Sequence, residues 1–489
     1  MPHSDENQEK RICYECVGEE YLANEIERTG EEGECSYCEE VAQSWTIEDL
    51  SEQIEAAFER HYARTPNQPE SWEVSLQVDR ELDDLWIRGG TPVVDAIEEA
   101  AGIPSEAAED VQVILAERHW DRHSEQIGEE TEFSSETNYE EIGPSDETWR
   151  AEWRKFEQSL KSEARFFSRT AADHLASIFG DIHRLRTQDG RQLIVDAGPK
   201  TVLDHLYRAR VFQSEEKLKD ALCRPDLHLG SPPGRFAASG RMNARGISVF
   251  YGATEPSGAL AEVRPPVGSH VVVAKFCIVR PLRMLDLSAL EFVYEEGSIF
   301  DPSFKEKLER VAFLRSLGRL ITKPVMPDDQ DLDYLATQAI ADFLATENEP
   351  RLDGIIFSSS QSESGNNVVL FHKAAKVAVE GFPAGTEITA QCCSEGEMGF
   401  SVHEEVPSQK ASGPQDAYEV FQLDFPDFTE FDENYDSRSI TLKIDISSVN
   451  VHYIDSVEVK SSSYAVTRHR MEKYSSQYMA TMPLRWGPR

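Results

Sequence analysis

The 489-residue sequence has no hydrophobic run of the roughly 18 to 20 residues that a membrane-spanning helix needs. Its first residues, MPHSDENQEKRICYEC, contain no apolar core of a secretory signal peptide. Internal repeats are also missing, which excludes solenoid and propeller architectures. We therefore expect a cytoplasmic protein without a membrane partner, and its length predicts about three domains.

Positive charge is scarce. The chain has 49 Lys and Arg residues against 89 Asp and Glu residues, a net charge of −40. Residues 1–150 alone contain about 41 acidic and about 10 basic residues. Such a surface repels phosphate backbones, so we expect no nucleic-acid partner for this region. The acidic residues indicate either a solvated surface, tuned for high salt, or a docking face for a basic partner.

The chain has only eight cysteines, and four of them form two Cys-x-x-Cys pairs. Without a secretory signal, a disulfide framework is not expected. Cys13, Cys16, Cys35 and Cys38 follow the pattern C-x2-C-x18-C-x2-C, which is typical of a four-thiolate zinc knuckle. Four thiolates fill every corner of a tetrahedron, so the sequence predicts a structural Zn²⁺ in residues 1–42. The alternative is a set of redox thiols.

Residues 43–190 have the pattern of an all-α domain. Apolar residues recur at three- and four-residue steps in 45–62, and helical patterns follow in 91–103, 105–120 and 149–182. The polar, acidic stretch 121–148 between them is predicted to be a loop.

The pattern changes after residue 190 to short strands with interspersed helices, which indicates an α+β domain over residues 191–380. Residues 381–489 form a C-terminal extension. It contains a mobile acidic connector over 405–440 and two late strands, ITLKIDI and VHYIDSVEV.

The stretch GRMNARGISVFYGATEPSGALAEVR contains the residues that splitting NAD would require. A cation such as Arg241 can hold the pyrophosphate, and an aromatic ring such as Tyr251 can lie beside the nicotinamide. A carboxylate such as Glu262 can stabilise the cationic ribose. The spacing alone is equally compatible with an exposed arginine, a core tyrosine and a surface glutamate.

The amino-acid sequence of this region resembles the RES family over about residues 200 to 375. The resemblance rests on YRAR, then LGSPPGRFAASGRMNARGISVFYGATEPSGALAEVRPPVG, then LDLS and YLATQAIADFL, and finally DGIIFSSSQSESGNNVVLF. It implies an ADP-ribosyltransferase-like fold and a toxin that consumes NAD, with an antitoxin or regulatory protein as partner.

The resemblance also assigns roles to residues. Arg241 is implied to bind phosphate or ribose, Arg208 to be a second cation, Tyr251 to stack on nicotinamide, and Glu262 to be the catalytic carboxylate. The family's serine usually follows a proline at a strand end. Here Ser358 takes the proline position, so Ser359 is chosen among residues 358–360.

The order of a four-cysteine knuckle, a helical segment with ARFF and then this domain resembles the HEPN/RES N-terminal domain arrangement. Many HEPN domains carry an RNase motif, and Arg169 and His174 have its spacing. Because this spacing is common on any helix, a module that docks or restrains the RES domain is the preferred interpretation.

The preferred function is therefore a NAD glycohydrolase or phosphorylase. An ADP-ribosyltransferase with a macromolecular acceptor and a non-catalytic scaffold are the alternatives.

Overall fold

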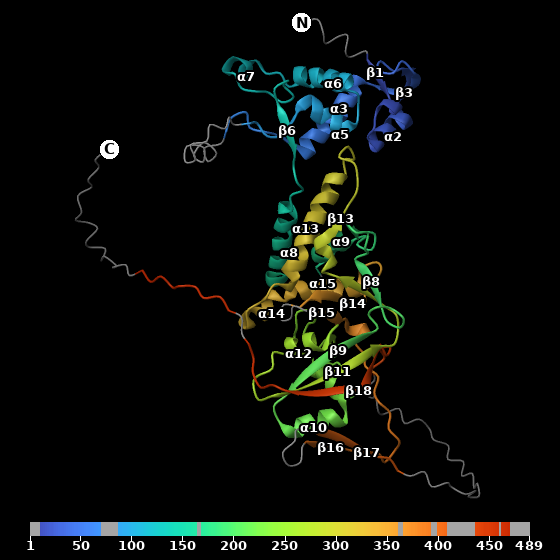
Figure 1. Cartoon of the computed structure of the whole chain (residues 1–489), viewed down its shortest axis with the longest axis vertical. Coiled ribbons are helices and arrows are strands. Elements are labelled where there is room, and N and C mark those ends of the chain that lie inside the picture. The colour runs from blue at the N-terminus through green and yellow to red at the C-terminus, as the bar shows by residue number, and fades with distance from the viewer. Residues whose placement is uncertain are drawn as a thin grey trace, which may run out of the picture.

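The computed structural model describes residues 10–69, 87–163, 168–359, 365–392, 399–407, 436–458 and 461–469. The ARFF sequence and most of the expected acidic connector lie outside these residues. Figure 1 shows an N-terminal unit at one end, a helical layer in the middle, and a large sheet below it. Within the described residues, no helix has both the length and the apolar character needed to cross a membrane.

The N-terminal unit contains two small sheets and several helices around one core. The first sheet has the order β1 (Arg11–Cys13), β3 (Val41–Thr46), β2 (Glu31–Glu34), with η1 (Tyr14–Cys16) and α2 (Glu20–Thr29) between its strands. The helices α3 (Ile47–His61), α5 (Val93–Ala101) and α6 (Ser105–Arg118) follow. Apolar residues from the cysteine-rich segment and from these helices share a single buried cluster, which includes Ile12, Leu22, Ile54, Phe58 and Val111.

The expected all-α character of residues 43–190 is wrong in one respect, because this segment also contains a three-stranded sheet. Its order is β4 (Tyr62–Arg64), β6 (Asn138–Glu141), β5 (Thr91–Pro92). The stretch 121–148, expected to be a loop, contains β6 and the short helix α7 (Arg122–Ile127). The sequence pattern of β6, NYEE, hides the strand because only Tyr139 is buried and no apolar alternation is present.

Two further helices before residue 190 belong to a different core. The helices α8 (Glu147–Ser162) and α9 (Arg169–Phe179) pack with α13 (Phe304–Thr322) and α15 (Leu335–Thr346). The stripe predicted on α8, formed by Trp149, Trp153, Phe156 and Leu160, is buried in this core. The buried clusters therefore cross the expected domain boundaries at residues 42 and 190.

The α+β character expected after residue 190 is present, in the form of an eight-stranded mixed sheet. Its order is β18 (Leu442–Tyr453), β11 (His270–Ile278), β9 (His205–Phe212), β10 (Phe250–Ala253), β15 (Asn366–Leu370), β14 (Gly354–Ser358), β12 (Leu282–Asp286), β8 (Ile194–Ala197). Only β12 and β14 pair in parallel; the other neighbours are antiparallel. The helices α10 (Glu215–Cys223), α11 (Pro225–Leu229), α12 (Pro256–Glu262) and α14 (Gln330–Asp333) connect strands, and β7 (Arg186–Thr187) pairs with β13 (Val293–Tyr294).

The C-terminal extension completes this sheet at one edge. Residues 442–446 of the expected late strand ITLKIDI and the first three residues of the second, VHYIDSVEV, belong to one long strand, β18; residues 454–458 are not in a strand. Strand β18 pairs with β11 across a register shift between Val273 and Lys275. A separate hairpin of β16 (Glu387–Cys392) and β17 (Phe400–Glu405) lies beside α10 (Figure 1).

Helix α13 connects the N-terminal unit to the rest of the chain. Phe300, in the loop before α13, is 2% exposed and belongs to the N-terminal core. Further along, the Arg310 guanidinium donates to the carbonyl oxygens of Ile178 and Gly180 at the end of α9. One end of α13 therefore contacts the N-terminal unit, and its middle holds α9.

Candidate active site and metal centre

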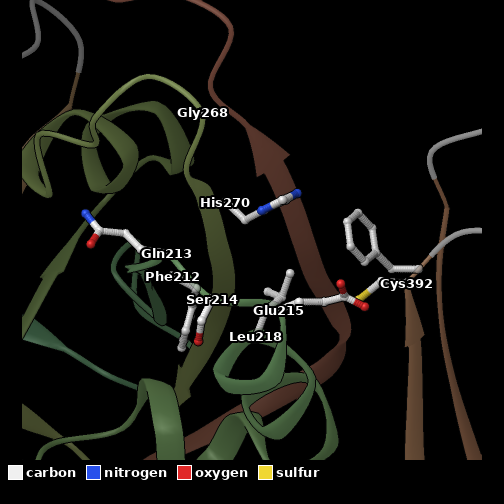
Figure 2. A pocket seen from close by; sticks show the side chains of 9 residues that line it. Phe212, Gln213, Ser214, Glu215, Leu218, Gly268, His270 and Cys392 are labelled. Carbon is white, nitrogen blue, oxygen red and sulfur yellow. The ribbon is translucent and has the colours of Figure 1, made fainter.

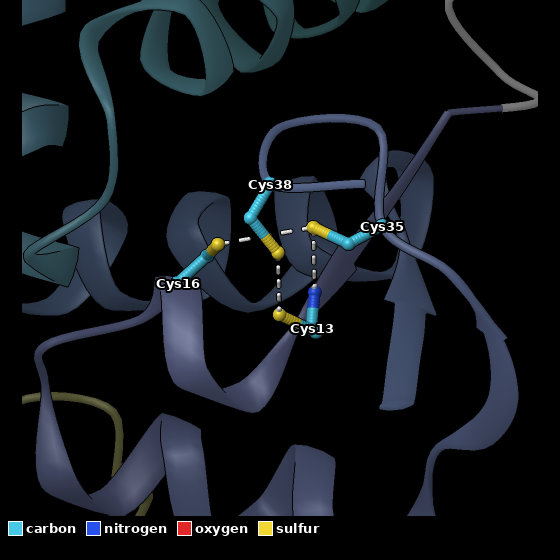
Figure 3. Close-up of side chains that lie close together, drawn as sticks. All are labelled: Cys13, Cys16, Cys35 and Cys38. Atoms are coloured by element: carbon cyan, nitrogen blue, oxygen red, sulfur yellow. Dashed lines mark hydrogen bonds between the residues drawn. The ribbon is translucent and has the colours of Figure 1, made fainter. Parts of the chain in front are cut away.

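The four N-terminal cysteines converge at one point (Figure 3). Their sulfur atoms all lie within 4.8 Å of one another. The Sγ atoms of Cys13 and Cys38 are 3.6 Å apart, and those of Cys16 and Cys35 are 3.8 Å apart. A tetrahedron with Zn–S bonds of about 2.3 Å has S···S edges of about 3.8 Å. The four thiols therefore fit a metal ion of this kind, and all four corners would come from the protein.

The local backbone prepares one of these thiols to lose its proton. Burial of Cys35 opposes ionisation, but backbone N–H groups of Tyr37, Cys13 and Cys38 donate to its sulfur and lower its pKa to about 7. Burial and the neighbouring thiols raise the pKa of Cys16. Because a bound metal requires thiolates, binding would release protons from this cluster.

A cavity of about 140 Å³ opens on the large sheet where three of the predicted site residues meet. Strands β9 and β10 contribute Arg208 and Tyr251, and helix α12 contributes Glu262 at its last residue. The other lining residues are Tyr207, Ala209, Gly252, Ala259, Val263, Phe357 and Asn367. The short turn between β10 and α12 places Tyr251 and Glu262, eleven residues apart in sequence, on the same cavity.

Arg208 is a partly buried residue whose guanidinium forms no ion pair within the described part of the chain. Its guanidinium carbon lies 4.7 Å from the centre of the Phe250 ring. Burial, and then the neighbouring Arg210, lower the pKa of Arg208 to about 10. Among the described residues, its buried Nη1 atom has no hydrogen-bond partner. Buried donors are nearly always paired, so an N–H group without a partner at this position is unusual.

Glu262 and Asn367, which both line the cavity, form a hydrogen-bonded pair. The Asn367 Nδ2 atom donates to Glu262 Oε2 at 3.0 Å, which fixes the carboxylate. The buried Oδ1 atom of Asn367 has no partner in the part of the chain that the structure describes. Two lining residues, Arg208 and Asn367, therefore each have one buried polar atom for which the described residues offer no partner.

Tyr251 organises the loop that precedes its own strand. Its hydroxyl donates to Asn243 Oδ1 at 2.9 Å and accepts from the Met242 N–H at 3.0 Å. Burial raises the pKa of Tyr251 to about 12, so the hydroxyl remains protonated. A Cβ atom at Gly240 would lie 2.6 Å from Asn243 Oδ1 and 2.7 Å from the Tyr251 hydroxyl, so only glycine fits there.

Arg241 lies outside this cavity. Its Nη1 atom donates to the Ile321 carbonyl at 2.6 Å and its Nη2 atom to the Lys323 carbonyl at 2.9 Å. Its guanidinium carbon is 5.0 Å from the centre of the Tyr334 ring. Arg241 therefore lines a different cavity from Arg208, Tyr251 and Glu262, and its role in binding NAD stays a prediction.

Ser359 also lies outside the lining. It is half-buried and follows β14 directly, and Phe357 of that strand lines the cavity. Ser358 is exposed, and Ser360 falls outside the described residues. The choice of Ser359 stays a prediction.

Thr337 and Gln338, which match a family-like T-Q pair without a chemical role predicted from the sequence, hold the loop before β10. The Thr337 hydroxyl donates to the Arg241 carbonyl at 2.5 Å, and the Gln338 amide donates to the Gly240 carbonyl at 2.9 Å. For Asn367, the sequence NNVVLF predicts a strand and no role in the site. A buried polar residue inside an apolar strand is a usable signal for a site, because burial without a partner is costly.

The two residues with the RNase-like spacing lie in different surroundings. His174 is packed against Phe156, with ring centres 5.3 Å apart, and burial lowers its pKa. Arg169 is exposed at the start of α9. His174 therefore serves the packing of α9 on α8.

A separate hollow of about 310 Å³ lies between α10, the start of β11 and the β16–β17 hairpin (Figure 2). It is lined by Phe212, Gln213, Ser214, Glu215, Leu218, Gly268, His270, Cys392 and Phe400. None of the predicted site residues is in this lining.

The large sheet, with a cavity of about 140 Å³ at β9, β10 and α12, defines an α+β domain. The family model described as the RES domain matches residues 205–389, so this part of the chain is a RES domain. No curated protein and no solved structure matches the chain. The likeness of the N-terminal half to a HEPN/RES N-terminal domain stays a prediction.

Proposed function

We propose that the RES domain cleaves the nicotinamide–ribose bond of NAD. The observation that carries the proposal is that two residues lining one cavity each have a buried polar atom without a partner among the described residues, Arg208 Nη1 as a donor and Asn367 Oδ1 as an acceptor. A ligand with both kinds of polar group would satisfy both atoms. The carboxamide and ribose hydroxyls of NAD supply such groups.

In this proposal, three residues that line the cavity each have one role. Glu262, oriented by Asn367, stabilises the positive charge that develops on the ribose as the bond breaks. Arg208 binds an oxygen of the substrate, and the electrostatic attraction between them is strongest where water is excluded. The Tyr251 ring forms an aromatic wall for the nicotinamide.

The cavity volume is below the roughly 300–1,000 Å³ of sites that enclose drug-sized ligands. We infer that it takes the nicotinamide end, with the remainder of the dinucleotide outside it. Water as the acceptor would yield ADP-ribose, and phosphate would yield its 1″-phosphate. A macromolecular acceptor would make the protein an ADP-ribosyltransferase.

The test is release of nicotinamide from NAD by the purified protein, with and without phosphate. Arg208→Gln should lower kcat/KM about tenfold or more, because a charge-assisted hydrogen bond is lost. Arg210→Gln is the matched control: Arg210 is exposed two residues away and binds the His228 carbonyl. Equal losses in both variants would contradict the assignment of Arg208.

We also propose that the metal in the four-cysteine cluster is Zn²⁺ with a structural role. Support comes from the closed set of four thiols and their spacing. Bound Zn²⁺ would link the two cysteine turns and so stabilise the N-terminal unit.

A further inference from the structure

A second cavity, of about 350 Å³, lies between α8 and the segment 320–337. Its size falls within the roughly 300–1,000 Å³ of small-molecule sites. Arg241 lines it, and the next residue, Met242, donates its N–H to Tyr251, which lines the cavity at Glu262. Helix α8 lies outside the matched RES region, so the walls come from two parts of the chain.

The sequence of α8 places charged residues on this wall. Arg150, Arg154, Glu157 and Lys161 recur at four-, three- and four-residue steps, so they form one stripe along the helix. They lie beside the buried stripe that includes Trp153, whose ring also lines the cavity. Packing of the buried stripe therefore fixes the direction in which the charged stripe points.

The lining is strongly cationic in an otherwise acidic protein. Five side chains are basic and two are acidic, a net charge of +3, whereas the whole chain has −40. Lys161 pairs with Asp333 at 2.8 Å, and Arg150 pairs with Asp146 at 2.6 Å. Among the described residues, Arg154 and Lys323 have no ion-pair partner.

The Arg241 guanidinium is oriented in advance, because two carbonyl oxygens hold it at the end of α13. Guanidinium groups match phosphate oxygens in geometry, and several cations in one hollow match an anion with more than one charge. We propose that this cavity binds a phosphate-bearing anion of the diphosphate class. The diphosphate can be a free anion or part of a dinucleotide.

The anion site has a direct structural connection to the candidate active site. Thr337 lines the cavity, and its hydroxyl holds the Arg241 carbonyl. The next residue, Met242, donates its N–H to the Tyr251 hydroxyl. Binding at the anion site therefore stabilises the loop that Tyr251 also holds, and such coupling is reciprocal. The anion site does not depend on the proposed function; only its effect on turnover does.

The test is calorimetric titration of the full-length protein with inorganic pyrophosphate at fixed ionic strength. We expect binding, and the double variant Arg154→Gln/Lys323→Gln should weaken it about tenfold or more. Lys155→Gln removes one charge from an exposed position on the same helix, outside the lining, and should change the affinity less than about twofold. No binding by the wild type, or equal weakening by the control, would overturn the proposal.

A second titration distinguishes the two sources of the anion. It uses the Glu262→Gln background with saturating NAD present. If NAD displaces pyrophosphate, the site holds the diphosphate of the dinucleotide. If both bind together, the site takes a free anion, and both results support the site. Failure of the wild type to cleave NAD would refute the proposed function and leave the pyrophosphate result unaffected.

Discussion

Replacing Tyr251 by phenylalanine tests whether its hydroxyl holds the loop 237–247. The change keeps the aromatic ring and removes two hydrogen bonds, one to Asn243 Oδ1 and one from the Met242 N–H. Both partner atoms would lose the only hydrogen bond described for them. Each unsatisfied buried group costs about 1–3 kcal/mol, so the loop should lose at least about 2 kcal/mol of local stability.

Hydrogen exchange measures this loss directly. The loop contains protected amides, such as the Gly246 N–H donating to the Ala237 carbonyl and the Gly240 N–H donating to the Asn243 carbonyl. A loss of about 2 kcal/mol should accelerate their exchange about thirtyfold, since about 1.4 kcal/mol corresponds to a factor of ten.

Tyr207→Phe is the matched control. Tyr207 lines the same cavity on the neighbouring strand, and within the described part of the chain its hydroxyl has no hydrogen bond. Unchanged exchange in Tyr251→Phe, or equal acceleration in Tyr207→Phe, would refute the reasoning.

Three further predictions concern the rest of the chain. Phe300→Ala should destabilise the packing of the N-terminal unit on α13 by about 3–5 kcal/mol, because it leaves a cavity at a buried position. Limited proteolysis near residue 143 measures this loss. The control Phe292→Ala, at a ring that is 55% exposed, should have little effect. Burial holds the pKa of His174 below its usual 6.5, so the unfolded chain binds the proton more tightly and stability falls as the pH drops below 6.5. His174→Phe should reduce that loss in thermal unfolding; an identical pH profile would contradict it. Purified protein should contain one metal ion per chain, which Cys16→Ser loses and Cys223→Ser keeps; a metal-free wild type would refute the zinc assignment.

Much of the fold could be read from local patterns. The stripe on α8 and the cysteine spacing predicted features that the structure contains, because helical periodicity and ligand spacing are local properties of the chain. Strand β6 was missed because a short, polar strand gives no apolar alternation. The grouping of α8 and α9 with α13 depends on contacts between residues more than a hundred positions apart, and no local pattern encodes them.

The candidate site shows the same limit. Tyr251 and Glu262 were predicted to act together, and one strand and one short helix bring them to the same cavity. The Arg241 guanidinium, however, donates to two carbonyl groups at the end of α13, some eighty residues later in the chain, and lines another cavity. The contribution of Asn367 depends on the pairing of β10 with β15, which sequence spacing does not reveal.

The measurement that tests the central claim most directly is release of nicotinamide from NAD by the wild-type protein and by Glu262→Gln. We expect turnover by the wild type and a fall of about a hundredfold or more in Glu262→Gln, since the charge that stabilises the ribose cation is lost. Glu255→Gln, an exposed carboxylate at the other end of α12, should retain the wild-type rate. Intact NAD after incubation with a folded wild-type protein, or full activity in Glu262→Gln, would contradict the account and favour a non-catalytic scaffold.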